Sequence, residues 1–137
     1  MGCESIEAIM RTGDWAAAAH ACESALQLQP SNPKMWGYLG LCEFRLCEYA
    51  KAEVALRKAT ILDPSYHDAG VKHAQCLDKL RRYEEAYQVA KEWLVKRPND
   101  NTLRGLVEFL TPMVHGEAQG WERTMHLSHR VVLAREE

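Results

Sequence analysis

The sequence predicts an all-α fold in which antiparallel helix pairs repeat along the chain. Three stretches, residues 14–30, 48–64 and 82–98, share an aromatic residue in second place, an alanine in fifth place and a proline in last place. The three prolines are spaced by 34 residues without an insertion. A fixed period of this length is typical of a helical repeat array, in which each unit packs on the next.

The middle unit shows the helix pair most clearly. Its first helix is predicted from about Pro33 to Leu46, because Asn32 can cap it and proline suits the first helical turn. Its second helix is predicted from about Tyr49 to Leu62, and the following proline ends it. The inward residues of this second helix are expected to be Ala52, Ala55, Leu56, Ala59 and Leu62.

The third unit is predicted to begin with a capping box formed by Ser65 and Asp68. Small residues at matching places of paired helices indicate a close approach of the helix axes. We therefore expect Gly40 to face Ala52 in the second unit, as Ala74 faces Ala86 in the third.

The period divides the chain into two parts. Residues 1–98 are expected to form three units, 1–30, 31–64 and 65–98. Residues 99–137 are expected to form a degenerate fourth repeat or capping helices, which cover the last apolar face of an array. In this part Pro112 should kink or end a helix, and Trp121 aligns with the aromatic residues of the earlier units.

These residues resemble the tetratricopeptide repeat (TPR) family, whose motif combines W-x2-L-G-x2-Y with A-x3-F, a second alanine and a proline. The second unit departs from it at Glu43, which replaces the tyrosine, and at Leu56, which replaces the phenylalanine. In the third unit Trp93 replaces the second small residue, and we expect Ala90 to offset its volume. The second unit matches the motif at Trp36, Leu39, Gly40, Ala52, Ala59 and Pro64.

The resemblance implies a right-handed superhelix with a C-terminal capping helix, and a concave groove lined by the first helix of each unit. A protein or peptide partner is expected to bind in this groove, and the alternative is that the tail helix or a second copy of the chain covers it. The residues that the family register places in the peptide groove are Met10, Arg11, Lys34, Tyr38, Leu41, Phe44, Arg45, Val71, Lys72, Gln75, Lys79, Leu106 and Phe109.

Two functions are compatible with this resemblance. The first is a scaffold or adaptor that binds a partner peptide or helix, and the second is a small chaperone similar to the class II chaperones of type III secretion. Chaperone-binding members of the family clamp the carboxylates of EEVD tails with basic and amide side chains. The matching places contain one basic residue and two acidic ones, which argues against this clamp: Cys3, Glu7, Tyr38, Asp68 and Lys72.

Composition and charge exclude other classes of partner. The net charge of -2 and the pI of about 6.3 provide no basic surface for nucleic acid. No apolar run is long enough to cross a bilayer, so no membrane is expected. The five cysteines lie mostly at inward helical places, which indicates reduced thiols and a cytoplasmic location.

The sequence contains no motif of an enzyme. His73 and Cys76 lie one turn apart, but both are at inward places and are expected to be core residues. His115, His126 and His129 are close in sequence but lack the further ligands of a zinc site. We therefore expect no catalysis, no metal and no cofactor.

Overall fold

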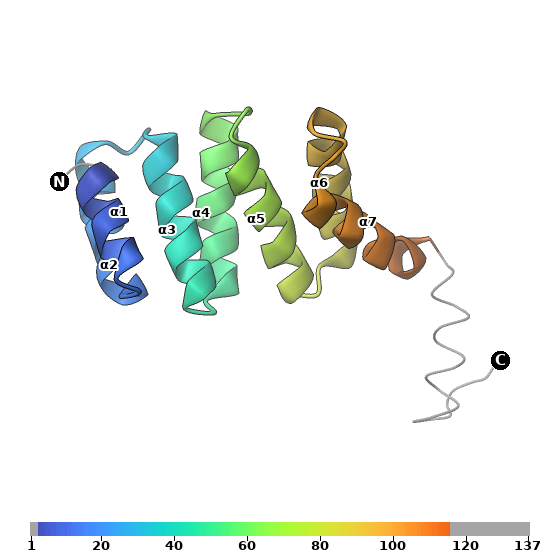
Figure 1. The fold of residues 1–137 in the computed structure, drawn as a ribbon, viewed down its shortest axis with the longest axis horizontal. Coiled ribbons are helices and arrows are strands. Elements are labelled where there is room, and N and C mark those ends of the chain that lie inside the picture. The colour runs from blue at the N-terminus through green and yellow to red at the C-terminus, as the bar shows by residue number, and fades with distance from the viewer. Residues whose placement is uncertain (1–2, 116–137) are drawn as a thin grey trace, which may run out of the picture.

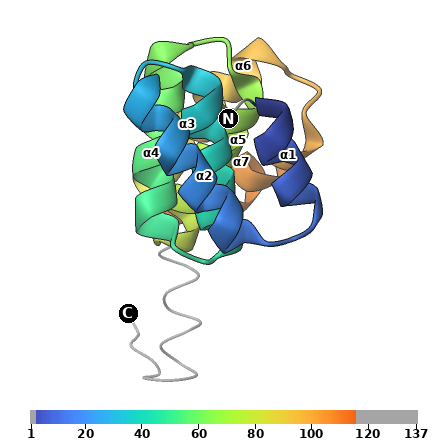
Figure 2. The same cartoon turned by 90° about the vertical axis from the view of Figure 1, so that its left-hand side faces the viewer.

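The computed structural model describes residues 3–115, which form α-helices without any strand. Successive helices pack against each other in chain order, and the first and last of the described helices lie at opposite ends of the stack (Figure 1). Figure 2 shows the same stack from the end that contains α1. The helices are α1 (Cys3–Arg11), α2 (Trp15–Leu28), α3 (Pro33–Arg45), α4 (Tyr49–Leu62), α5 (His67–Lys79), α6 (Tyr83–Lys96) and α7 (Asn101–Val114).

The 34-residue period is present in the helix boundaries. The helices α3, α5 and α7 begin at residues 33, 67 and 101, and α2, α4 and α6 begin at residues 15, 49 and 83. The turn inside each pair contains one residue with a left-handed backbone, and these are Gly13, Cys47 and Arg81. These regular boundaries confirm the all-α repeat fold, and they place α7 in register as a further first helix.

Side-chain caps begin three of the helices. Asn32 Oδ1 accepts from the backbone N–H of Lys34 at 3.0 Å at the start of α3, and Asp14 and Asp100 cap α2 and α7 in the same way. The predicted capping box of the third unit is wrong. The hydroxyl of Ser65 donates instead to Asp63 at 2.7 Å, and α5 begins two residues later, after Tyr66.

Glycines in the first helices accommodate large side chains from the next elements. A Cβ atom on Gly40 would lie 2.5 Å from Leu56, so Gly40 faces Leu56 and not Ala52, one turn away. A Cβ atom on Gly70 would lie 2.1 Å from Trp93. Gly70 of α5 therefore offsets the volume of Trp93. The sequence predicts only Ala90 for this role and does not indicate the contribution of Gly70.

The predicted inward face of α4 is otherwise correct at Ala52, Ala55, Leu56 and Ala59, which are all buried. Leu62 is 41% exposed because it lies in the last turn, beyond the contact between Ala59 and α5. The remaining core consists mainly of alanines and leucines between successive helices, together with Ile6, Cys22, Met35, Tyr87 and Trp93.

Glu43 is a buried acid in the middle of this stack. It occupies the place of the motif's tyrosine, and only 7% of it is exposed. Its Oε1 atom has no hydrogen-bond partner among the described residues. Burial, followed by the charges of Glu23 and Glu48, raises the pKa of Glu43 from 4.5 to about 7.

The contact between Gly70 and Trp93 predicts that alanine substitutions at two glycines change the free energy of unfolding in opposite directions. Gly70→Ala should lower the free energy of unfolding by about 1–3 kcal/mol, because the added methyl group overpacks the site. Gly105→Ala is the control, since a Cβ atom there meets nothing within 4 Å. It should raise stability by up to about 1 kcal/mol through helix propensity. Urea unfolding measures both, and equal effects would contradict the packing at Gly70.

The buried Glu43 predicts a pH dependence of stability. The pKa of this group is higher in the folded chain than in the unfolded chain, so folding binds protons between these two pKa values. Stability relative to Glu43→Gln should therefore be greatest below pH 4.5 and fall as the pH rises to about 7. Urea unfolding of both proteins from pH 4 to pH 8 checks this. Parallel curves would show that Glu43 titrates normally.

Candidate functional site

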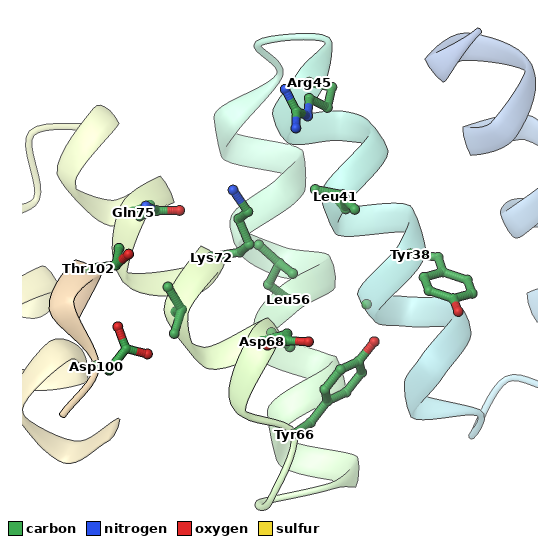
Figure 3. A pocket seen from close by; sticks show the side chains of 13 residues that line it. Tyr38, Leu41, Arg45, Leu56, Tyr66, Asp68, Lys72, Gln75, Asp100 and Thr102 are labelled. Carbon is green, nitrogen blue, oxygen red and sulfur yellow. The ribbon is translucent and has the colours of Figure 1, made fainter. Parts of the chain in front are cut away.

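The inner faces of α3, α5 and α7 enclose a hollow of about 510 Å³ (Figure 3). A second hollow of about 450 Å³ continues it and shares Gln75 and Thr102 with it. We call the two hollows together the inner groove. Its lining residues are Gly37, Tyr38, Leu41, Arg45, Leu56, Tyr66, Asp68, Ala69, Val71, Lys72, Gln75, Asp100 and Thr102 in the first hollow, with Phe44, Asp78, Lys79, Gly105, Leu106 and Phe109 added by the second.

Helical spacing brings these side chains to one surface. On α3, Tyr38, Leu41 and Arg45 follow one another at intervals of three and four residues, which places them on one face. The opposite face of the same helix contains Leu39 and Cys42, which are buried in the core. A single amphipathic helix therefore supplies both the packing with α2 and α4 and one wall of the inner groove.

The close approach of Tyr66 to α3 shapes one end of the groove. A Cβ atom on Gly37 would lie 2.6 Å from the hydroxyl oxygen of Tyr66, so the ring occupies space that only glycine leaves free. Figure 3 shows Tyr66 and Asp68 at the same end of the hollow, and Arg45 at the opposite end. Leu56 and Ala69, both buried, contribute the apolar floor.

Two cations face the groove from adjacent helices. Figure 3 shows Arg45 on α3 and Lys72 on α5. The lysine side chain extends along the hollow as far as Leu41. Burial, followed by repulsion from Arg45, lowers the pKa of Lys72. The Lys72 ammonium lies 4.7 Å from the centre of the Phe44 ring, and the Arg45 guanidinium lies 5.3 Å from the centre of the Trp15 ring. Neither cation forms an ion pair with another described residue.

The acidic groups in and beside the groove differ in whether they already accept hydrogen bonds from the chain. Tyr38 donates a hydrogen bond to the carboxylate of Glu7, so two of the places that match the family's carboxylate clamp bind each other. Asp100 accepts from the α7 backbone and lies 2.7 Å from His67 Nε2, and this hydrogen bond is the main cause that lowers the pKa of Asp100. Asp68 is exposed at the end of the groove.

One acceptor in the groove is unsatisfied. The Oε1 atom of Gln75 is buried and has no hydrogen-bond partner among residues 3–115. Gln75 lines both hollows and lies where they join. A buried acceptor without a partner costs about 1–3 kcal/mol, which a donor from a ligand would offset.

The structure brings most of the predicted groove residues together. All of them line the two hollows except Met10, Arg11 and Lys34. Met10 packs against the core beside α2, while Arg11 and Lys34 are exposed outside the hollows. The role of the whole set in binding a ligand stays a prediction.

Tyr66 and Asp100 line the groove but were not predicted to do so. Both precede a first helix and therefore lie outside the helical register that the family motif describes. The position of Asp100 immediately before an apolar helix is a capping signal, and this signal could have indicated its place. No sequence signal identifies Tyr66, because its contact depends on the path of the turn against Gly37.

The candidate catalytic pair is part of the core. His73 is buried, and its Nε2 atom lies 2.9 Å from Glu53 Oε2. Burial, followed by the charge of Glu53, raises the pKa of Cys76 to about 12, so its thiol stays protonated near neutral pH. Within the part of the chain that the structure describes, no three His, Cys, Asp or Glu side chains form a cluster that could bind a metal. His126 and His129, which were not expected to bind a metal, lie outside the described residues.

None of the helices described between residues 3 and 115 has the length and apolar character needed to cross a membrane.

A family model for the tetratricopeptide repeat matches residues 7–67. The first TPR of Spaghetti (RPAP3) bound to HSP90 peptide SRMEEVD superposes with a TM-score of 0.77 at 22% identity, covering 81% of this chain and 88% of that one. The Arabidopsis OM64 TPR domain superposes with a TM-score of 0.75 at 23% identity, covering 80% of this chain and 91% of that one. The second TPR domain of human RPAP3 in complex with HSP70 peptide SGPTIEEVD gives 0.74 at 17% identity, over 79% and 90%. A comparison with curated proteins finds no match.

The environment of the thiols predicts their relative reactivity. Cys47 is exposed and Cys76 is buried with a raised pKa, so iodoacetamide at pH 8 should modify Cys47 much faster. Peptide mass spectrometry over a time course measures the two rates. Rapid modification of Cys76 in the folded chain would contradict its assignment to the core and reopen a catalytic function.

Proposed function

The chain belongs to the tetratricopeptide repeat family, and from this premise we propose that it is a protein–protein interaction module that binds an extended peptide in the inner groove. The groove combines apolar walls with a few charged and polar groups, as peptide-binding sites commonly do. Its two hollows are continuous, so they suit a segment of several residues. The narrower hypothesis of a secretion chaperone stays a prediction.

The observation that supports this proposal most is the cation pair formed by Arg45 and Lys72. Both side chains face the hollow without a carboxylate from the described residues. Repulsion between these like charges raises the free energy of the empty groove, and the lowered pKa of Lys72 reflects burial first and then this repulsion. An aspartate or glutamate side chain of a peptide would relieve this repulsion and form charge-assisted hydrogen bonds.

The likeness to peptide-bound structures supports an acidic ligand but suggests a different anchor. Two of the similar structures contain the peptides SRMEEVD and SGPTIEEVD, which are rich in glutamate. In this chain Glu7 and Asp68 occupy places of the carboxylate clamp, and they would repel a terminal carboxylate. We therefore infer that an internal acidic side chain, held between Arg45 and Lys72, anchors the peptide.

The second hollow provides the apolar part of the interface. Phe109 is 53% exposed, and Phe44 and Leu106 are half-buried beside it. Gln75 can accept a backbone N–H of the peptide between the charged and the apolar hollow. The favoured ligand is therefore an extended segment with an acidic residue followed or preceded by apolar side chains.

An array of immobilised seven-residue peptides tests this proposal. The wild type should select peptides with one or more acidic residues beside an apolar residue, and amidation of the C-terminus should not abolish binding. The double variant R45Q/K72Q should bind the selected peptides at least about tenfold more weakly, since hydrogen bonds to charged groups contribute roughly 1.5–3 kcal/mol each. Fluorescence polarisation measures these affinities.

The control is Lys34→Gln, which removes a charge from α3 outside the hollows. It should leave the affinity nearly unchanged, because screened surface charges contribute little. Equal losses in K34Q and R45Q/K72Q would mean that binding is a general charge effect. Unchanged affinity in R45Q/K72Q would show that the cation pair is not the anchor.

A further inference from the structure

A separate hollow of about 370 Å³ lies on the other side of α3, between α3 and α4. We call it the outer hollow. It shares no lining residue with the inner groove. Its walls are mostly apolar, and its lining residues are Trp36, Leu39, Glu43, Ala50, Lys51, Val54 and Ala55.

The outer hollow is lined by a buried carboxyl group, and one of its two oxygens has no hydrogen-bond partner among the described residues. Glu43 lines it, is 93% buried in the chain given its exposure of 7%, and its Oε1 atom accepts no hydrogen bond from the described residues. Such a group costs free energy in the isolated chain, because an ionised carboxylate in an apolar site requires a partner. The raised pKa of Glu43 is consistent with this missing partner.

Two cations of the chain lie near this part of α3 and α4. Lys51 lines the hollow, and its charge favours the ionised form of Glu43, but its ammonium also pairs with Glu48 at 3.8 Å. The Lys58 ammonium lies 4.5 Å from the centre of the Trp36 ring. Glu23 of α2 adds further negative charge near Glu43. The hollow is therefore apolar on its walls and acidic at its buried end, a combination that matches an alkyl stem with a terminal cation.

We propose that the outer hollow binds the side chain of a lysine or arginine from a partner protein, with the alkyl stem against Trp36 and Val54 and the cation at the Glu43 carboxylate. The apolar walls would exclude water from the ion pair and so strengthen it. This site would be distinct from the inner groove, so the chain could bind a peptide and a second, basic partner at the same time. It does not depend on the proposed peptide ligand.

The test uses n-butylammonium as the probe and n-butanol as a neutral control of the same length. NMR of the full chain follows the indole N–H of Trp36, which donates to the Pro30 carbonyl, and the side-chain carboxyl carbon of Glu43. Saturating n-butylammonium should shift both signals and lower the pKa of Glu43 by at least about one unit, which corresponds to a tenfold preference for the ionised form. Equal binding of n-butanol would assign the hollow to an apolar group and overturn the proposal.

Two variants separate the carboxylate from general charge. Glu43→Gln keeps the size of the side chain and should weaken n-butylammonium binding at least about tenfold. Glu92→Gln removes an exposed charge from α6 and should leave binding unchanged. Equal binding to wild type and Glu43→Gln would overturn the proposal, as would concentration-dependent shifts of Trp36 without probe, which would indicate that a second copy covers the hollow.

The proposal also fixes the pH dependence of binding. The cation requires an ionised Glu43, so the affinity for n-butylammonium should rise as the pH increases through about 7. The charged groups that influence Glu43 are Glu23 on α2, Glu48 before α4 and Lys51 on α4, and the thiols of Cys22 and Cys42 also interact with it. Binding that is independent of pH from 5.5 to 8 would contradict the role of Glu43.

Discussion

The stack depends on glycines that leave room for a large side chain from the following element. Leu56 enters at Gly40 and Trp93 enters at Gly70, in each case from the second helix of the same pair. Tyr66 approaches Gly37 across the next turn. Because a Cβ atom at any of these glycines would overlap the entering side chain, these close contacts fix how near α4 and α6 lie to their first helices.

The same contacts position the inner groove. When core side chains of α3 and α5 face their second helices, the opposite faces of α3 and α5 turn toward each other and toward α7. Arg45 and Lys72 are thereby held near each other on rigid elements, which favours a preorganised site. Packing thus holds two like charges on the lining of the inner groove, and in the proposed function an acidic ligand relieves their repulsion.

The period in the sequence was sufficient to predict the helices and most of their inward residues, because helical spacing determines which side of a helix a residue occupies. Spacing does not determine which turn of a partner lies opposite, so Leu56 rather than Ala52 faces Gly40. Lys34 also has a groove place in the register, but it lies exposed in the first turn of α3, outside the hollows. Residues in turns, such as Tyr66, have no register, and the environment of Glu43 emerges only from the packed helices.

The most direct test of the central claim, that the inner groove is the peptide-binding surface, is to map a bound peptide by NMR. An acidic heptapeptide with an amidated C-terminus would be titrated into isotopically labelled protein at low and at physiological salt. The account predicts that the perturbed amides gather on α3, α5 and α7, around Leu41, Lys72 and Gln75. Perturbations confined to α2, α4 and α6, or the absence of any shift with selected peptides, would contradict it.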